Sequence, residues 1–287
     1  MWVILPNNMN NNIDWLKGKS THLKLSAKAA GIYDSKYADE NFSTKLYMNY
    51  ELEVIDRAVK LLPFDKRGIA IDLGSGTGRD TLFFCKSFHK VIGYDFSPIM
   101  IEIADKNKTK LCVKNVTFIQ KDIDKNGLKE IEDGSISFVN AGFGMGSFIK
   151  DIGSLVKDVH RVLKQKGIFI ISFYNSNALV SQIAKKLKWE PSLSARFTDT
   201  KDSLKVVFQG NKFNIAAKAY TIQECKDVFS KYFKIVELST FPTVSSLLPN
   251  SIFGNLNVKN VFKQIDYAIG FDKKIAGGAY IIIVCRK

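Results

Sequence analysis

Residues 72–79 read Asp-Leu-Gly-Ser-Gly-Thr-Gly-Arg and lie between the apolar run 68–73 and a helical pattern at 79–88. Three glycines within five positions let the chain turn sharply and let a ligand approach its backbone. The first amides of the helix that follows are free to bind that ligand. A strand, a glycine-rich turn and a helix in this order predict a binding site of the nucleotide type.

The spacing of the glycines separates this turn from the dinucleotide-binding fingerprint. That fingerprint places its third glycine three residues after the second, but here Gly76 and Gly78 are two residues apart and Arg79 follows. Asp72 adds a carboxylate, which would repel a pyrophosphate and suits an amine or a cation. The turn therefore disfavours a nicotinamide oxidoreductase and favours an amine-bearing or cationic ligand.

Strands and helices alternate on both sides of the turn, which predicts an α/β fold built on a parallel sheet. The expected strands are short apolar runs, and the helices between them have apolar residues at helical spacing. Strands are expected at 68–73, 90–95, 116–120, 135–141, 168–173, 233–239 and 279–284, and helices at 51–62, 79–88, 97–110, 148–163, 221–232 and 258–269.

Two further aspartates stand at the ends of the next two strands. Asp95 ends the second strand, where a carboxylate can accept hydrogen bonds from ribose hydroxyls, and Asp122 follows the third, where it can accept one from an adenine amino group. A single aspartate at such a place is usually a turn or cap residue. Three acids at successive strand ends are a stronger signal, because ligands of open α/β sheets bind along that edge.

With these motifs the chain resembles the class I S-adenosylmethionine-dependent methyltransferases, in particular their quinone-biosynthesis-type branch. The resemblance is strong over residues 45–173 and looser over 220–286. It implies a seven-stranded, mostly parallel, doubly wound sheet with an antiparallel last strand. Residues 72–80, 91–100, 118–123 and 138–141 resemble the family's first four motifs, 162–167 the loop before its fifth strand, and 220–224 with 233–238 its later helix and strand.

The resemblance also implies S-adenosylmethionine as the cofactor, together with the residues that hold it. Glycines of the turn would flank the methionine and sugar portion, acids would bind the amino group, the ribose and the adenine, and apolar side chains would cover the adenine. The residues so implied are Asp72, Gly74, Ser75, Gly76, Gly78, Asp95, Phe96, Met100, Asp122, Ile123, Asn140 and Ala141. Asn140 stands where the family often has an acid, so no catalytic base is assigned.

The rest of the chain predicts a lid and a small-molecule acceptor. Residues 1–62 are expected to form a tail and a helical cap, and 63–287 the methyltransferase domain. Its insert, 174–220, predicts a helix at 178–187 and a hairpin of 204–208 with 213–219. Cap and insert together would cover the cofactor edge, which suits a small acceptor. Candidate acceptor contacts are Tyr47, Phe143, Tyr174 and Arg196.

Charge keeps a second enzymatic interpretation open. The formal net charge is +14, from 42 basic and 28 acidic residues, which would suit an RNA methyltransferase. Only six of the basic residues are arginines, however, and arginine is the preferred reader of phosphates and bases. Nucleic acid is therefore the less favoured partner. A nucleotide-binding module without catalysis is the remaining alternative, which the intact acids and glycines disfavour.

Other sequence features indicate the cellular environment in which the protein works. The four cysteines form no paired motif, so we expect buried, reduced thiols and neither a metal site nor a disulfide framework. No apolar run reaches the roughly 20 residues of a membrane-spanning helix, and the N-terminus lacks the basic leader of a secretory signal. We therefore expect a cytoplasmic protein. The three histidines, His22, His89 and His160, are weak candidates for the site.

Overall fold

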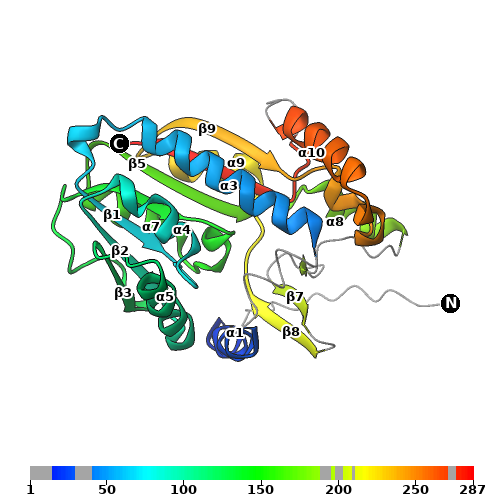
Figure 1. Ribbon diagram of the computed structural model, residues 1–287, viewed down its shortest axis with the longest axis horizontal. Helices are drawn as coiled ribbons and strands as arrows, with labels where there is room; N and C mark the ends of the chain where they lie inside the picture. The colour runs from blue at the N-terminus through cyan, green and yellow to red at the C-terminus, as the bar shows by residue number, and fades with distance from the viewer. Residues whose placement is uncertain (1–14, 30–40, 188–194, 198–202, 209–210, 271–275) are drawn as a thin grey trace.

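The computed structural model describes residues 15–29, 41–187, 195–197, 203–208, 211–270 and 276–287. Its main sheet has seven strands in the order β3-β2-β1-β4-β5-β10-β9 (Figure 1). They are β1 (Ile69–Leu73), β2 (Lys90–Asp95), β3 (Val116–Gln120), β4 (Ile136–Ala141), β5 (Leu163–Tyr174), β9 (Lys234–Phe241) and β10 (Tyr280–Arg286).

The direction of the strands confirms the predicted class. β1 pairs in parallel with β2 and β4, β2 with β3, and β4 with β5. The last strand, β10, is antiparallel to both of its neighbours, β5 and β9. The strand order reverses between β1 and β4, because the chain adds β2 and β3 on one side of β1 and β4 and β5 on the other. At such a switch point open α/β sheets have the crevice in which they bind ligands.

Helices cover both faces of this sheet because its central strands are apolar on both sides. Ile168 and Ile170 of β5 belong to one core, and Phe169 and Ile171 belong to the other. The helices around the sheet are α3 (Phe42–Lys60), α4 (Arg79–Phe84), α5 (Pro98–Lys110), α6 (Ile123–Asn126), α7 (Ile152–Val162), α9 (Ile222–Phe229) and α10 (Leu256–Gly270).

Local signals explain where several helices begin. Thr221 and Glu224 form the expected capping box at the start of α9, each side chain accepting the other's backbone N–H. Pro98 opens α5 at its first position. The helix expected from residue 148 begins instead at Ile152, because Asp151 caps it and residues 145–148 form a 3-10 turn.

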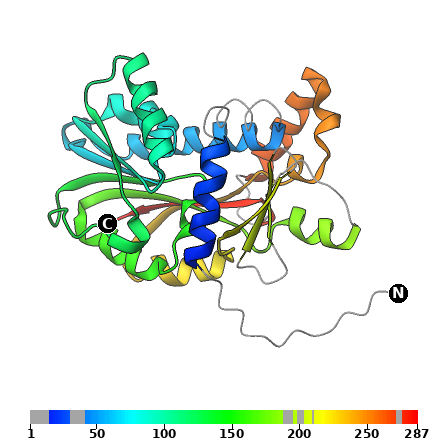
Figure 2. The same cartoon turned by 90° about the horizontal axis from the view of Figure 1, so that it is seen from below.

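A second, smaller layer lies beyond the ends of the main strands. It contains α1 (Trp15–Ala29) and a three-stranded sheet of β6 (Ala195–Phe197), β7 (Ser203–Phe208) and β8 (Asn211–Ala216). The predicted hairpin is thus present as β7 and β8, and its turn at 209–210 lies outside the described residues. Figures 1 and 2 show α1 beside this hairpin; we call α1 with β6, β7 and β8 the lid.

The lid has an apolar interior of its own. Gly18 packs so tightly on β8 that a Cβ atom there would lie 2.3 Å from the Cβ of Ala216. Leu25 and Ala29 of α1 join a cluster with Leu204, Val206, Phe213, Ile215 and Ala217. The insert helix α8 (Leu179–Leu187) forms as predicted but lies elsewhere, against residues 245–247 and 277. Of the predicted insert, the hairpin therefore contributes to the lid.

Two sequence expectations about the environment can be compared with the described residues. Cys85, Cys225 and Cys285 are buried as expected, but Cys112 is exposed. That expectation was wrong for Cys112 because the residue lies in the turn that follows α5, at a φ of 55°. Among the described helices, none is both long and apolar enough to cross a bilayer.

Candidate functional site

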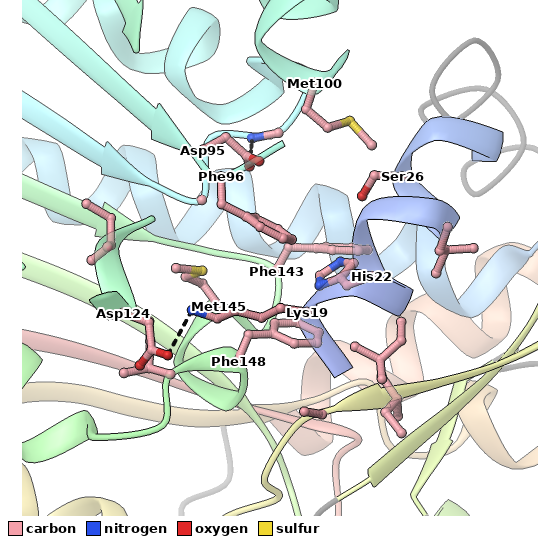
Figure 3. Close-up of a pocket in the computed structure, with 18 of the residues that line it drawn as sticks. Lys19, His22, Ser26, Asp95, Phe96, Met100, Asp124, Phe143, Met145 and Phe148 are labelled. Carbon is pink, nitrogen blue, oxygen red and sulfur yellow. Dashed lines mark hydrogen bonds and ion pairs between the residues drawn. The ribbon is translucent and has the colours of Figure 1, made fainter. Parts of the chain in front are cut away.

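A cavity opens between the carboxyl ends of the main strands and the lid (Figure 3). The turn after β1 and the ends of β2 and β3 form one side, and the loop after β4 continues it. The lid closes the opposite side. Residues that line the cavity include Gly18, Lys19, His22, Leu25, Gly74, Gly76, Asp95, Phe96, Met100, Asp122, Ile123, Asp124, Phe143, Met145, Phe148, Tyr174, Leu204, Val206, Ile215 and Ala216.

The glycine-rich turn has the backbone that its sequence requires. Gly74, Gly76 and Gly78 have φ values of 72°, 53° and 83°. Residues that carry a Cβ atom rarely adopt such positive φ values. At Gly74 a Cβ would also lie 2.6 Å from the sulfur of Met145. Gly74 and Gly76 therefore bring bare backbone to the cavity wall, as a close-binding ligand needs.

Asp95 fixes this turn while it faces the cavity. One oxygen of its carboxylate accepts the N–H of Gly76 at 2.9 Å, and the other accepts the N–H of Ser97 at 2.8 Å. The residue is 8% exposed, and burial raises the pKa of its carboxyl. Phe96 and Met100 follow it along the same wall. These contacts hold a buried acceptor at the end of β2.

Asp72 is set behind the wall. Its oxygens accept hydrogen bonds from the hydroxyl of Thr81 and, at 2.8 Å, from the amide of Asn140. Burial, together with the nearby carboxylate of Asp80, raises the pKa of Asp72 to about 7. Asp72, Ser75, Gly78, Asn140 and Ala141 do not line the cavity; they support the loops that do. Their predicted role in cofactor binding stays a prediction.

Lys19 was not anticipated from the sequence, and it pairs with the predicted adenine acceptor. Its ammonium lies 2.7 Å from Asp122 and 2.9 Å from Asp124. Asp122 also caps α6 through the N–H of Lys125. Figure 3 shows the Lys19 side chain reaching from α1 across the cavity toward Asp124.

His22, which the sequence presented as a weak candidate, lies inside the cavity. Its ring sits between those of Phe96 and Phe148, with centroids 5.1 Å and 5.0 Å away. Burial lowers the pKa of His22 to about 4, so the imidazole is neutral near pH 7. The helical spacing of Gly18, His22 and Leu25 was the signal that could have placed these residues on one face.

A buried acidic centre, also missed from the sequence, supports the loop after β4. The carboxylate of Glu51, which is fully buried, accepts the hydroxyl of Tyr47 at 2.8 Å and the N–H of Phe143 at 2.6 Å. Its other oxygen pairs with Arg79 at 2.9 Å. Burial raises the pKa of Glu51. This arrangement joins α3 to the start of α4 and fixes the backbone at Phe143.

The four candidate acceptor contacts are placed differently. Phe143 and Tyr174 line the cavity. Tyr47 does not: its ring stacks on that of Tyr280 at 3.8 Å. Arg196 belongs to β6, and its side chain lies outside the described part of the structure. The site thus combines a polar side at Asp95, Asp122 and Asp124 with an apolar side under the lid.

Comparisons with known proteins agree with this geometry. A family model described as a methyltransferase domain matches residues 64–236. The uncharacterized protein MJ1252 of Methanocaldococcus jannaschii is 27% identical, over 80% of this chain and 85% of its own length. Demethylmenaquinone methyltransferase of Chlorobaculum tepidum is 29% identical over 53% of this chain, which spans 58% of that relative.

A solved structure shares the fold. The crystal structure of an S-adenosylmethionine-dependent methyltransferase from Clostridium acetobutylicum superimposes with a TM-score of 0.57 at 17% identity. The match covers 91% of this chain and 98% of the other. At this identity the match shows the fold.

Proposed function

Since this chain belongs to the class I S-adenosylmethionine-dependent methyltransferases, we propose that it methylates a small, largely apolar molecule held between the main sheet and the lid. S-adenosylmethionine supplies a methyl group on a sulfonium; a nucleophile that attacks this methyl carbon displaces S-adenosylhomocysteine as the leaving group. The protein's part is to hold the acceptor in line with that group and away from water.

The cavity has the features that the cofactor needs. We propose that Asp95 binds the ribose, because its buried carboxylate faces the cavity. The adenine would be covered by Phe96, Met100 and Ile123. Asp122 would accept a hydrogen bond from the adenine amino group. The open backbone at Gly74 and Gly76 would lie along the methionine portion, where Asp72 adds negative charge from behind.

The apolar side of the cavity is the observation that carries the proposed acceptor class. Leu25 of α1 and Val206 and Ile215 of the hairpin line it with apolar side chains. Phe148 and Tyr174 face them from the main domain. Burial of apolar acceptor surface against these side chains would favour binding. A cavity with an apolar wall of this kind suits a small molecule better than a folded polymer.

The proposal can be tested by labelling without knowledge of the acceptor. The protein is incubated with S-adenosylmethionine carrying a deuterated methyl group and with a cell extract divided into lipid-soluble metabolites, polar metabolites and RNA. Label is expected in a lipid-soluble compound. Asp95→Ala, which removes the proposed ribose contact, serves as the control and should leave every fraction unlabelled. Label in RNA alone would overturn the proposal.

The net charge of +14 favours one other candidate, an RNA methyltransferase. Its binding to RNA would weaken steeply as salt rises, because bound phosphates release counterions. Affinity for total transfer RNA, measured between 50 and 500 mM salt, separates the candidates. A flat or undetectable response removes RNA as the acceptor. A protein that binds the cofactor but labels no fraction would instead match a module without catalysis.

A further inference from the structure

Lys19 binds the carboxylate that is expected to receive the cofactor's adenine. Its Nζ lies 2.7 Å and 2.8 Å from the two oxygens of Asp122, so one ammonium engages both. The same Nζ lies 2.9 Å from Asp124. The three side chains are 22%, 29% and 12% exposed, respectively, so the contacts are partly shielded from water. We call this arrangement the Lys19 clasp.

We propose that Lys19 competes with the adenine amino group for Asp122, and that cofactor binding transfers the ammonium to Asp124 alone. The inference rests on the proposed role of Asp122 as the adenine acceptor, and it does not depend on the identity of the methylated molecule. Affinity for the adenosyl group is then set partly by a residue of the lid, outside the matched methyltransferase domain.

The transfer needs a side-chain movement only. Helix α1 is held on the hairpin by the close contact of Gly18 with Ala216 and by the burial of Leu25 and Ala29. Lys19 carries three N–H donors on a flexible four-carbon stem. It can therefore release one carboxylate and keep the other while α1 stays in place.

Among the described basic side chains near Asp122, Lys19 is the one that forms a salt bridge with it. Lys121, the next basic side chain on this wall, pairs with Glu130 and lies over the ring of Tyr94, 5.2 Å from its centroid. The N–H of Lys125 donates to Asp122 at 3.3 Å, but it belongs to the backbone and carries no charge. Among the described residues, the salt bridges of Asp122 thus come from Lys19 alone.

Binding of S-adenosylhomocysteine, measured by isothermal titration calorimetry, tests the clasp directly. This ligand keeps the adenosyl group and lacks the sulfonium charge, so changes at Lys19 act on it mainly through Asp122. Lys19→Met keeps the apolar stem and should tighten binding about fivefold, the size expected for a partly exposed ion pair. Lys24→Met, an exposed position of α1, is the matched control and should change nothing.

A second variant reverses the sign of the effect. Asp124→Asn keeps an oxygen for the N–H of Lys150, which Asp124 accepts at 2.8 Å, but removes the alternative partner of Lys19. It should weaken binding about fivefold alone and have no effect in a Lys19→Met background, as a double-mutant cycle would show. Lys19→Arg keeps the ion pairs and should behave like the wild type.

Contradictory results are equally clear. If Lys19 instead closes the lid over the bound cofactor, Lys19→Met weakens the affinity, and the proposal fails. It also fails if the affinity is unchanged, or if Asp124→Asn has the same effect with and without Lys19. Circular dichroism of each variant verifies that the fold is retained. A wild-type protein that does not bind the ligand would refute the clasp and the assigned cofactor site together.

Discussion

Replacement of Asp72 by asparagine should stabilise the protein at neutral and alkaline pH and leave its stability near pH 4 almost unchanged. The carboxylate is buried behind the glycine-rich turn, and its pKa is raised to about 7. Because the folded state holds the proton more tightly than the unfolded state, the free energy of unfolding falls as pH rises from about 4 to 7.

The magnitude follows from the displaced pKa. A change from 3.8 to about 7 corresponds to about 4 kcal/mol between the protonated and ionised forms. Asparagine does not ionise, so this loss is absent from the variant. The new amide can also be accommodated: Asn140 is able to flip, since its Oδ1 has no partner among the described residues. Its oxygen would then accept the N–H of the new side chain.

Urea unfolding followed by circular dichroism, at pH values between 4 and 8, measures the effect. The difference in unfolding free energy between Asp72→Asn and wild type should grow between pH 4 and 7 and then stay level. Asp65→Asn, which removes a carboxylate that is 70% exposed, is the control. A difference that does not vary with pH would refute the reasoning, as would a variant less stable than wild type at pH 8.

Three other changes test the site and the lid. Asp95→Ala should weaken binding of S-adenosylhomocysteine about tenfold in calorimetry, because the ribose hydroxyls lose their proposed acceptor and the N–H of Gly76 loses its partner; unchanged affinity would contradict the ribose assignment. Gly18→Ala should reduce the free energy of unfolding by about 1–3 kcal/mol in a urea titration, since its methyl group would overlap Ala216; an equally stable variant would contradict the close packing. Glu51→Ala should cost about 1–3 kcal/mol in the same assay, because the buried hydroxyl of Tyr47 loses its acceptor, whereas a neutral result would mean that this contact contributes little.

The main sheet could be predicted from the sequence because each of its strands is an apolar run bounded by clear signals. β2 and β3 occur at the predicted residues, and the capping box at 221–224 starts the expected helix. Patterns that depend on residues close together along the chain can be recognised in a single sequence. The glycine-rich turn belongs to this class, since its spacing alone implies its backbone.

The site could be predicted only in part, because its remaining residues meet through tertiary contacts. Lys19 and Asp122 are about a hundred residues apart, and nothing near either one indicates their ion pair. Glu51 looked like an ordinary polar residue of a helix, yet it is fully buried beside Arg79. His22 likewise enters the cavity only because α1 packs on a hairpin almost two hundred residues later.

The composition of the lid has a consequence for synthesis of the chain. Helix α1 precedes the other described elements in the chain, but the lid cluster that buries its apolar face is incomplete until residues 204–217 have left the ribosome. Strands β1 to β5 are complete before then, and chains generally fold from the N-terminus as they emerge. The carboxyl edge of β1 to β5 can therefore form while it is still uncovered, and the lid side of the cavity is completed only after the hairpin has been made.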